Sequence, residues 1–411
     1  MSGCNNVNVE PTVIGGGDGS TAYDAFGRLR VSNPLTIFDS KNVMSKNNLF
    51  DESLTANGTV SYTADKSTVN LNVTEVSGDK TIRQSKRVMS YQPGKSLLIF
   101  NTFVMNTLTA NLKQKVGFFD GNNGIFFYAD GTTLKIVRRT YTSGSAIDTE
   151  ISQSNWNGDK LDGTGASGFT LDPTTSNILF IDVEWLGVGS VRVGFVINGI
   201  LITAHTFNNA NNLTTVYMQT ANLPIRYEIE TADTLAAGTY TLQQICSSCI
   251  SEGGYSPSGV RQMVGTTAIA GSRLPTADTF YSIGTFRIKS GRPYAVIIPA
   301  GYTVAGLETT DFQVGLFKGV TLASGSFSYS SFSDNVEYDL TVRELSATGT
   351  QLSSNFISGR DSPVATFGDE IPFDYQIGQT IGGTSEVITL AAKATTNNDD
   401  IAFTIEWYDL T

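Results

Sequence analysis

The feature that most constrains the fold of this chain is an alternation of apolar and polar residues with a period of two. In residues 69–73 Val and Leu alternate with Asn, and in residues 401–407 Ile, Phe and Trp alternate with Ala, Thr and Glu. Alternation of this kind gives a strand one apolar face, whereas an amphipathic helix needs apolar residues three and four positions apart. No long segment shows that helical spacing. The pattern therefore predicts half-buried β-strands.

Residue pairs that favour tight turns separate these predicted strands. Asn-Gly and Asp-Gly pairs can adopt the positive φ values of two-residue hairpin turns, and they occur at 57–58, 120–121, 130–131 and 198–199. Two three-stranded meanders are predicted, one over residues 116–119, 125–128 and 134–138 and one over residues 177–185, 191–197 and 200–207. Short antiparallel strands at this spacing predict a β-sandwich or barrel.

The length of the chain and two flexible stretches define its predicted domains. At 411 residues it is too long for one ordinary domain. Residues 15–19 (GGGDG) cannot pack a core, and residues 251–259 are rich in Gly and Ser. We predict an all-β chain with four parts: an extended N-terminal arm (1–41), an antiparallel β-sandwich (42–250), a linker (251–259) and a C-terminal β-sandwich (260–411).

Charge and histidine content exclude several functions. The chain has 27 basic and 38 acidic residues, a net charge of −11, so it gains nothing from counterion release on nucleic acid. His205 is the single histidine, which removes multi-histidine metal sites. Asp120 and Asn122 open like a calcium loop, but position twelve is Gly131 rather than Glu. We expect no nucleic-acid partner, no cofactor and no metal, and we interpret these loop residues as turn formers.

The cysteines and the N-terminal residues indicate the cellular compartment in which the chain folds. Cys246 and Cys249 form a C-x-x-C motif without a second ligand pair, and with Cys4 they are too few for a disulfide framework. We interpret the pair as small residues on a strand. The start of the chain shows no secretory signal, and no apolar run approaches the ~20 residues of a membrane helix. We expect folding in a cytoplasm and no membrane insertion.

Residues 22–41 combine aromatic and basic side chains in a short segment. A segment of this composition ahead of folded domains suits attachment to a neighbouring protein. The docking candidates are Tyr23, Phe26, Arg28, Leu29, Arg30 and Phe38. The alternative is an N-terminal strand that packs on its own domain.

Several pieces of the chain resemble structural proteins of tailed bacteriophages, particularly those with large genomes. Residues 23–41 (YDAFGRLRVSNPLTIFDSK) are similar to a segment near the N-terminus of those proteins. Pieces similar to their central part are IDVEWLGVG with RVGF (181–195), AHTF (204–207), ANLP (221–224) and ISEGGY (250–255). The resemblance implies a virion component whose central sandwich is a lectin-like, concanavalin-type jelly roll. It carries over no defined catalytic residue.

Because jelly rolls also occur in glycosidases, carboxylate pairs need consideration. Asp182 and Glu184 lie two residues apart on one predicted strand, a backbone spacing of about 6.6 Å. This spacing is close to that of glycosidase carboxyl pairs. The simpler interpretation is two acids on the solvated face of a strand whose Trp185 lies in the core.

A glycan site is the other ligand chemistry that such a sandwich can carry. Aromatic rings stack on sugar faces, and Trp156 is the Trp residue in an evident loop. We take Trp156, Asn157 and Asp159 as glycan-binding candidates, with an anchored loop as the alternative.

These observations predict a non-enzymatic structural component of a bacteriophage virion. We expect an exposed capsid decoration, fibre or tail-associated subunit, docked on other virion proteins through its N-terminal segment. Ser- and Thr-rich surfaces and sandwiches in series suit a homo-oligomer, specifically a trimer. One alternative is a tail adhesin that binds a host surface glycan. A further alternative is a glycoside hydrolase that uses Asp182 and Glu184.

Overall fold

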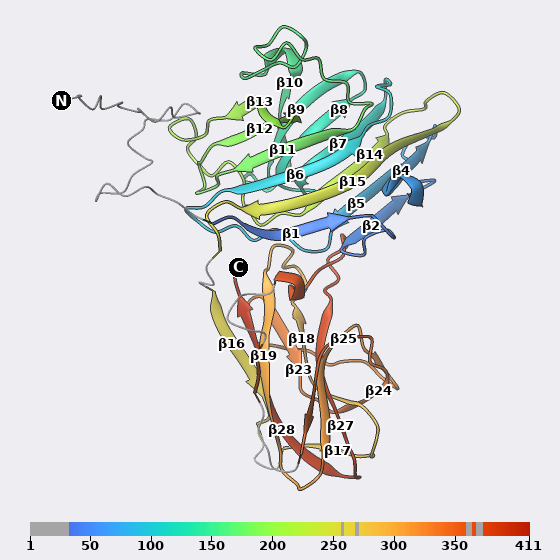
Figure 1. The fold of residues 1–411 in the computed structure, drawn as a ribbon, viewed down its shortest axis with the longest axis vertical. Helices are drawn as coiled ribbons and strands as arrows, with labels where there is room; N and C mark the ends of the chain where they lie inside the picture. The colour runs from blue at the N-terminus through green and yellow to red at the C-terminus, as the bar shows by residue number, and fades with distance from the viewer. Residues whose placement is uncertain (1–32, 256–258, 268–270, 359–363, 367–372) are drawn as a thin grey trace, which may run out of the picture.

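The computed structural model describes residues 33–255, 259–267, 271–358, 364–366 and 373–411. These residues form 28 strands and no α-helix, arranged in two lobes that are stacked along the long axis of the molecule (Figure 1). Within the same ranges, no helix has the length and apolar character needed to cross a membrane. Each lobe contains two antiparallel sheets, which confirms the predicted all-β fold of two successive β-sandwiches.

The first sandwich packs an eight-stranded sheet on a seven-stranded sheet. The eight-stranded sheet has the order β13 (Ile200–Phe207), β12 (Val191–Ile197), β11 (Asn177–Val183), β6 (Leu97–Val104), β15 (Thr239–Ser251), β4 (Thr68–Thr74) and β3 (Thr59–Thr63), with β1 (Leu35–Lys41) beside β15. The seven-stranded sheet has the order β10 (Ile147–Ser152), β9 (Thr133–Thr140), β8 (Gly124–Asp130), β7 (Leu112–Phe119), β14 (Ile225–Thr231), β5 (Lys80–Ser85) and β2 (Phe50–Thr55).

The period-two pattern decides which faces of the two sheets meet. In β8 the side chain of Phe127 points into the core, whereas Phe126 belongs to a separate apolar cluster. The Phe127 ring lies 6.0 Å from the ring of Phe103 in β6 and 5.1 Å from that of Phe195 in β12. Both predicted meanders are observed, as β7–β9 and β11–β13, so alternation together with turn chemistry located these strands correctly.

The first sandwich begins earlier than the sequence predicts. β1 pairs antiparallel with the second half of β15, from Leu35 opposite Ser251 to Lys41 opposite Cys246. Its residues therefore belong to the sandwich and not to an arm that ends at residue 41. The alternative of a strand packing on its own domain is correct for residues 35–41, while residues 1–32 lie outside the described residues.

The second sandwich is built on the same principle. One sheet has the order β16 (Val260–Gly265), β28 (Asp399–Asp409), β19 (Ile297–Gly306) and β26 (Val364–Thr366), with β17 (Ser272–Leu274) beside β28. The other has the order β21 (Thr321–Leu322), β24 (Arg343–Ala347), β18 (Tyr281–Ile288), β27 (Val387–Ala394), β20 (Phe312–Lys318) and β25 (Thr350–Ile357), with β23 (Val336–Asp339) beside β18 and β22 (Ser330–Ser331) beside β23. Between the sheets, the Trp407 ring stacks on the Phe286 ring at 4.8 Å.

Apolar side chains of the second sandwich enter the core of the first. Phe373, in the 3₁₀ turn η4 (Phe373–Tyr375), is buried there and meets the Tyr255 ring edge-on at 4.8 Å. Val296, just before β19, and Ile298, near its start, belong to the same core. Because the two sandwiches share apolar contacts, they form one packed unit and are not independent domains joined only by a linker.

Hydrogen bonds reinforce this junction. Gln376 Nε2 donates to the Val88 carbonyl at 3.0 Å, and the backbone N–H of Gln379 donates to the Lys86 carbonyl at 2.7 Å. The buried guanidinium of Arg87 donates to a backbone carbonyl of η4. Buried polar groups need such partners because an unpaired one costs about 1–3 kcal/mol.

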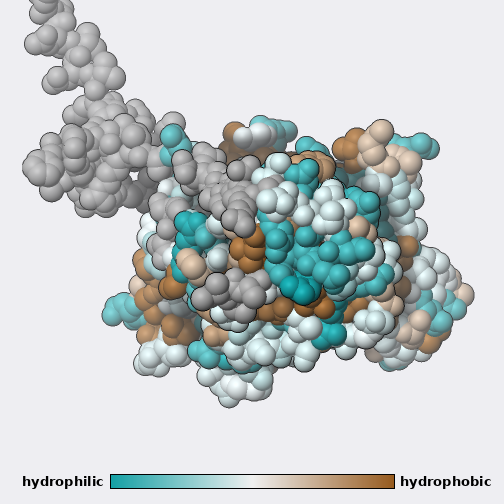
Figure 2. All heavy atoms as spheres, turned by 90° about the horizontal axis from the view of Figure 1, so that it is seen from below, coloured by the Kyte–Doolittle hydropathy of each residue, from teal (hydrophilic) through white to brown (hydrophobic). Residues whose placement is uncertain are grey.

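The face of the molecule at the end where the second sandwich lies mixes hydrophobic and hydrophilic residues. Seen from the end of the molecule at which this sandwich lies, apolar residues form small patches separated by weakly polar and hydrophilic ones (Figure 2). This surface agrees with a chain in which only 16% of the residues are charged.

We predict that Phe373→Ala uncouples the two sandwiches. Loss of this buried ring should weaken the junction by about 3 kcal/mol. In scanning calorimetry the wild-type chain should unfold in one transition and the variant in two. Leu54→Ala, at a half-exposed position of β2, is the matched control and should leave one transition. A single transition for Phe373→Ala would show that the shared core does not couple the sandwiches.

Candidate functional site

The structure gives Phe38 a role different from the predicted one. Its side chain is only 4% exposed and packs edge-on against Phe50 at 5.9 Å inside the first sandwich. A buried ring cannot serve as a docking contact, so this prediction is wrong for Phe38. The other docking candidates, namely Tyr23, Phe26, Arg28, Leu29 and Arg30, lie outside the described residues.

The predicted glycan loop has a structural role. Trp156 is 2% exposed and donates its Nε1–H to the Ile151 carbonyl at 3.1 Å, so it offers no ring face to a sugar. The backbone N–H groups of Gly158 and Asp159 donate to carbonyls of β13, at 2.9 and 3.0 Å. These bonds cover the free edge of that strand. The alternative of an anchored loop is therefore the correct one.

The remaining two glycan candidates, Asn157 and Asp159, belong to the same loop that covers the edge of β13. The Asn157 side chain accepts the backbone N–H of Thr206 at 2.8 Å and donates to the Thr206 carbonyl at 2.9 Å. The Asp159 carboxylate accepts backbone N–H groups of Leu161 and Ser167. Burial alone would raise the pKa of Asp159, but these hydrogen bonds outweigh it and lower the pKa.

Asp182 and Glu184 do not share a strand. β11 ends at Val183, and Glu184 lies in the turn that follows, where its backbone N–H donates to the Ser190 carbonyl. Asp182 forms an ion pair with Arg192, its neighbour on β12. The predicted pair of acids on one strand face is therefore not formed.

His205 and the loop that begins at Asp120 form local hydrogen bonds. His205 Nδ1 accepts the backbone N–H of Asn157 at 3.3 Å, and burial lowers the pKa of the ring. The Asp120 carboxylate accepts the backbone N–H groups of Asn122 and Asn123, both at 2.7 Å, as expected of a turn former. Within the described ranges, no three His, Cys, Asp or Glu side chains are grouped so as to hold a metal ion.

The outer face of the seven-stranded sheet carries a paired network of charges. Glu228 of β14 is 2% exposed and contacts Lys115 at 2.9 Å, Lys80 at 3.0 Å and Arg226. Arg226 in turn lies over the Phe119 ring at 5.4 Å. Burial alone would raise the pKa of Glu228, but the three cations hold it far below its usual range. A carboxylate that stays ionised in this way cannot act as a general acid near neutral pH.

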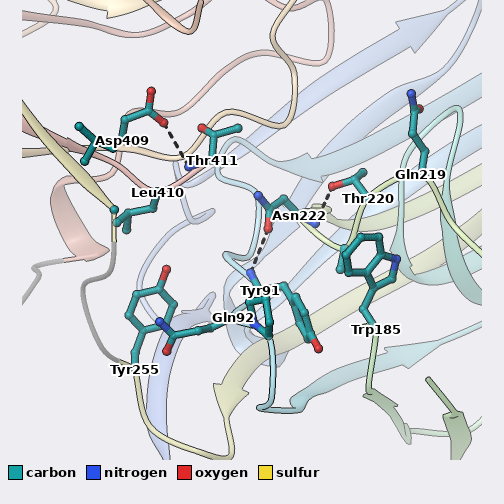
Figure 3. Close-up of a pocket in the computed structure, with 14 residues that line it drawn as sticks. Tyr91, Gln92, Trp185, Gln219, Thr220, Asn222, Tyr255, Asp409, Leu410 and Thr411 are labelled. Carbon is teal, nitrogen blue, oxygen red and sulfur yellow. Dashed lines mark hydrogen bonds between the residues drawn. The ribbon is translucent and has the colours of Figure 1, made fainter. Parts of the chain in front are cut away.

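A cavity with several aromatic lining residues lies at the junction of the two sandwiches. A cavity of about 400 Å³ is lined from the first sandwich by Tyr91, Trp185 and Asn222, and from the connecting and C-terminal segments by Tyr255 and Leu410. Tyr255 stands on one side of the cavity and Trp185 on the other, with Tyr91 and Asn222 between them (Figure 3). Its volume lies within the range of about 300–1,000 Å³ that is usual for ligand sites.

Hydrogen bonds hold the lining side chains in place. Asn222 Oδ1 accepts the backbone N–H of Tyr91 at 3.0 Å, as the dashed line in Figure 3 shows. The indole Nε1–H of Trp185 donates to the Met218 carbonyl at 3.1 Å, and the Tyr255 hydroxyl lies 2.7 Å from Ser90 Oγ. The aromatic walls are therefore preorganised.

The cavity has little charge. Asp409 is the one charged side chain among its described lining residues. Its carboxylate accepts from Asn335 Nδ2 at 3.0 Å and from the backbone N–H of Thr411 at 3.1 Å. Aromatic and amide groups without a cation suit a neutral ligand and disfavour an anionic one.

Sequence reasoning did not identify this cavity, although a signal was present. Trp185, Asn222 and Tyr255 belong to three separate pieces that carry the resemblance to phage proteins. Trp185 was expected in a core, but it is half-buried and lines the cavity. The three pieces meet at one cavity because the two sandwiches pack together. A local sequence pattern does not predict this packing.

Comparisons with known proteins give weak likenesses only. No protein-family model matches the chain, and no curated protein matches it. The carbohydrate recognition domain of Emp47p is 9% identical with a TM-score of 0.34, over 57% of this chain and 99% of that domain. The CBM2 module of the evolved Dit protein of Lactobacillus casei phage J-1 is 6% identical with a TM-score of 0.35, over 55% of this chain and 100% of that module. A Shewanella oneidensis protein of unknown function is 8% identical with a TM-score of 0.37, over 56% of this chain and 91% of that one. Likenesses at this level carry no conclusion about function.

We predict that Glu228→Gln destabilises the first sandwich by about 3 kcal/mol at neutral pH, because three cations lose their shared anion. The folded pKa of Glu228 lies below its ordinary value of 4.5. Its stabilising contribution is therefore present above that pH and is lost as the pH falls below it. Urea unfolding should give free energies of unfolding for wild type and variant that converge as the pH is lowered.

The control is Glu230→Gln, which removes an ion pair with Lys80 alone and should cost less than about 1 kcal/mol. Equal losses for the two variants would contradict the special role of Glu228.

Proposed function

We propose that this chain is a non-enzymatic structural component of a bacteriophage virion. It would be made in the host cytoplasm and exposed on the particle as a capsid decoration, a fibre or a tail-associated subunit. The observation that best supports this function is that Trp185, Asn222 and Tyr255, from three pieces that resemble phage structural proteins, meet at the junction of two rigidly joined sandwiches. A stable body of this kind suits permanent exposure on a particle.

The proposed attachment uses the segment that precedes the first sandwich. Residues 23–41 carry the N-terminal part of the resemblance, and the last seven of them form β1. The docking candidates Tyr23, Phe26, Arg28, Leu29 and Arg30 are thus joined directly to a strand of the body. A contact made by these residues on another virion protein would orient the whole molecule.

We predict that a shortened chain beginning at Asn33 keeps its thermal stability but does not join virions. The cut spares β1, whereas a cut after residue 41 would remove a strand of the sandwich. Incorporation can be measured by immunogold labelling of particles with an antibody against residues 260–411, and the position of the gold on wild-type particles distinguishes head from tail. Normal incorporation of the shortened chain would exclude docking through residues 1–32.

A second candidate function is adhesion to a neutral host glycan. The specific observation in its favour is the junction cavity, where Trp185 and Tyr255 lie on opposite sides with Tyr91 and Asn222 between them (Figure 3). Aromatic rings pack on the apolar faces of sugars, and the amide of Asn222 keeps one N–H and one lone pair free for sugar hydroxyls. Both functions are compatible in one tail-exposed protein.

We predict that Trp185→Ala weakens glycan binding about tenfold, the equivalent of 1.4 kcal/mol. The measurement is saturation-transfer NMR of the full chain with a panel of neutral mono- and disaccharides, followed by titration of the best ligand. Leu186→Ala, at the exposed neighbouring position, is the matched control and should bind like wild type. If no sugar of the panel binds at millimolar concentration, the adhesin candidate fails and the structural role alone remains.

A further inference from the structure

Free sheet edges are exposed to pairing with other chains, and proteins protect them with charge, shortness or a cover. The first sandwich uses two of these devices. The edge strand β13 is covered by the backbone of Gly158 and Asp159. The edge strand β2 carries Asp51 and Glu52, and the edge strand β10 likewise carries two acids.

Most edges of the second sandwich are also protected. β16 carries Arg261, which forms an ion pair with Glu406 on the neighbouring strand. β21 and β26 are only two and three residues long. Short strands present too few backbone groups to support a stable partner strand.

β25 lacks all of these protections. Its eight residues read TQLSSNFI, without a charge or a proline. It pairs with β20 along one side, and no other described strand pairs with its outer side. Among the described edge strands that have neither a charge nor a cover, β25 is the longest, ahead of β3 with five residues.

The edge strand β25 also carries an exposed aromatic side chain. Phe356 is 80% exposed, the second highest value among the exposed large apolar side chains described. It stands beside a cavity of about 340 Å³ that is also lined by Phe312, Ile357 and Ala394. A free edge and an exposed aromatic ring thus coincide on one strand.

We propose that the outer edge of β25 pairs antiparallel with β25 of a second copy of this chain, about a two-fold axis. A second copy is the partner that fits, because an uncharged edge faces its own equivalent without like-charge repulsion. Isologous contacts of this kind are the commonest in soluble homo-oligomers. This contact makes a dimer, in place of the trimer that the sequence suggested.

The register follows from which face each residue occupies. The pairing of β25 with β20 shifts between Gln351 and Ser353, so residues 353–357 form the longest regular stretch. Directly opposed residues of an antiparallel pair point to the same face. Ser353 and Asn355 point inward, where both contact the Tyr302 hydroxyl, so Ser354 and Phe356 point outward.

This alternation places Asn355 opposite its own equivalent on the two-fold axis and Ser354 opposite Phe356 of the second copy. The two Phe356 rings then become diagonal neighbours on the outer face, about 7–8 Å apart between backbones and within reach of each other. Each exposed ring would be covered by its equivalent. The two-fold contact therefore removes the free edge and the exposed aromatic surface together.

Sedimentation equilibrium of the full chain tests the proposal. Wild type should form dimers at micromolar concentration, and Phe356→Asp should raise the dimer dissociation constant by about tenfold or more. Met44→Asp, at an apolar position that is 90% exposed elsewhere, is the matched control and should dimerise like wild type. At concentrations low enough to keep all three proteins monomeric, the melting temperatures of both variants should equal the wild-type value, since both side chains are exposed. A monomeric wild type, or a trimer that Phe356→Asp leaves intact, would overturn the proposal.

Disulfide trapping tests the register independently. Opposed Cα atoms of an antiparallel pair lie about 4.5–5.5 Å apart, within the range that a disulfide spans. Asn355→Cys should therefore give covalent dimers under mild oxidation. Gln351→Cys, on the same strand but about 26 Å from its equivalent in this register, should not cross-link more than wild type, which retains the exposed Cys246. Equal cross-linking at both positions would overturn the two-fold pairing.

Discussion

The burial of Phe373 in the core of the first sandwich is the contact on which the rest of the molecule depends. With Val296 and Ile298 it brings apolar surface of the second sandwich into the first, and hydrogen bonds from Gln376 and Gln379 satisfy the backbone carbonyls of Val88 and Lys86 at the interface. The junction cavity exists only because the sandwiches are docked in this way. The same docking fixes the position of β25 relative to β1.

A second constraint is the need to satisfy strand edges in a chain that builds no α-helix among its described residues. The loop that begins at Trp156 meets this need for β13. On the outer face of the seven-stranded sheet, the buried Glu228 pairs with three cations, and two of them, Lys115 and Arg226, lie over aromatic rings. Both features contain residue types that elsewhere bind ligands. In this structure the hydrogen bonds and ion pairs of these residues stabilise the fold.

The contrast between Trp156 and Trp185 shows what local reasoning can achieve. Alternation and Asn-Gly or Asp-Gly turns predicted β7–β9 and β11–β13 closely, because both signals act over a few residues. The same reasoning placed Trp156 in an evident loop and Trp185 in the core. The structure buries Trp156 within its loop, and it leaves Trp185 half-buried, packed against the core and lining the cavity. The exposure of a side chain depends on segments distant in sequence: Trp156 lies beside β13, and Trp185 lies near the C-terminal strand of the other sandwich. Phe38 was misassigned for the same reason, since its partner β15 lies some two hundred residues away.

The sequence by itself determined the fold class, most strand positions and the succession of two sandwiches, because these follow from composition, periodicity and turn chemistry. Only the tertiary structure decided where the first sandwich begins, which acids are neutralised, which Trp residue lines a cavity and which strand edge stays open. Those properties are set by contacts between residues far apart in the chain. Their energies depend on packing and burial that appear only when the sheets are assembled.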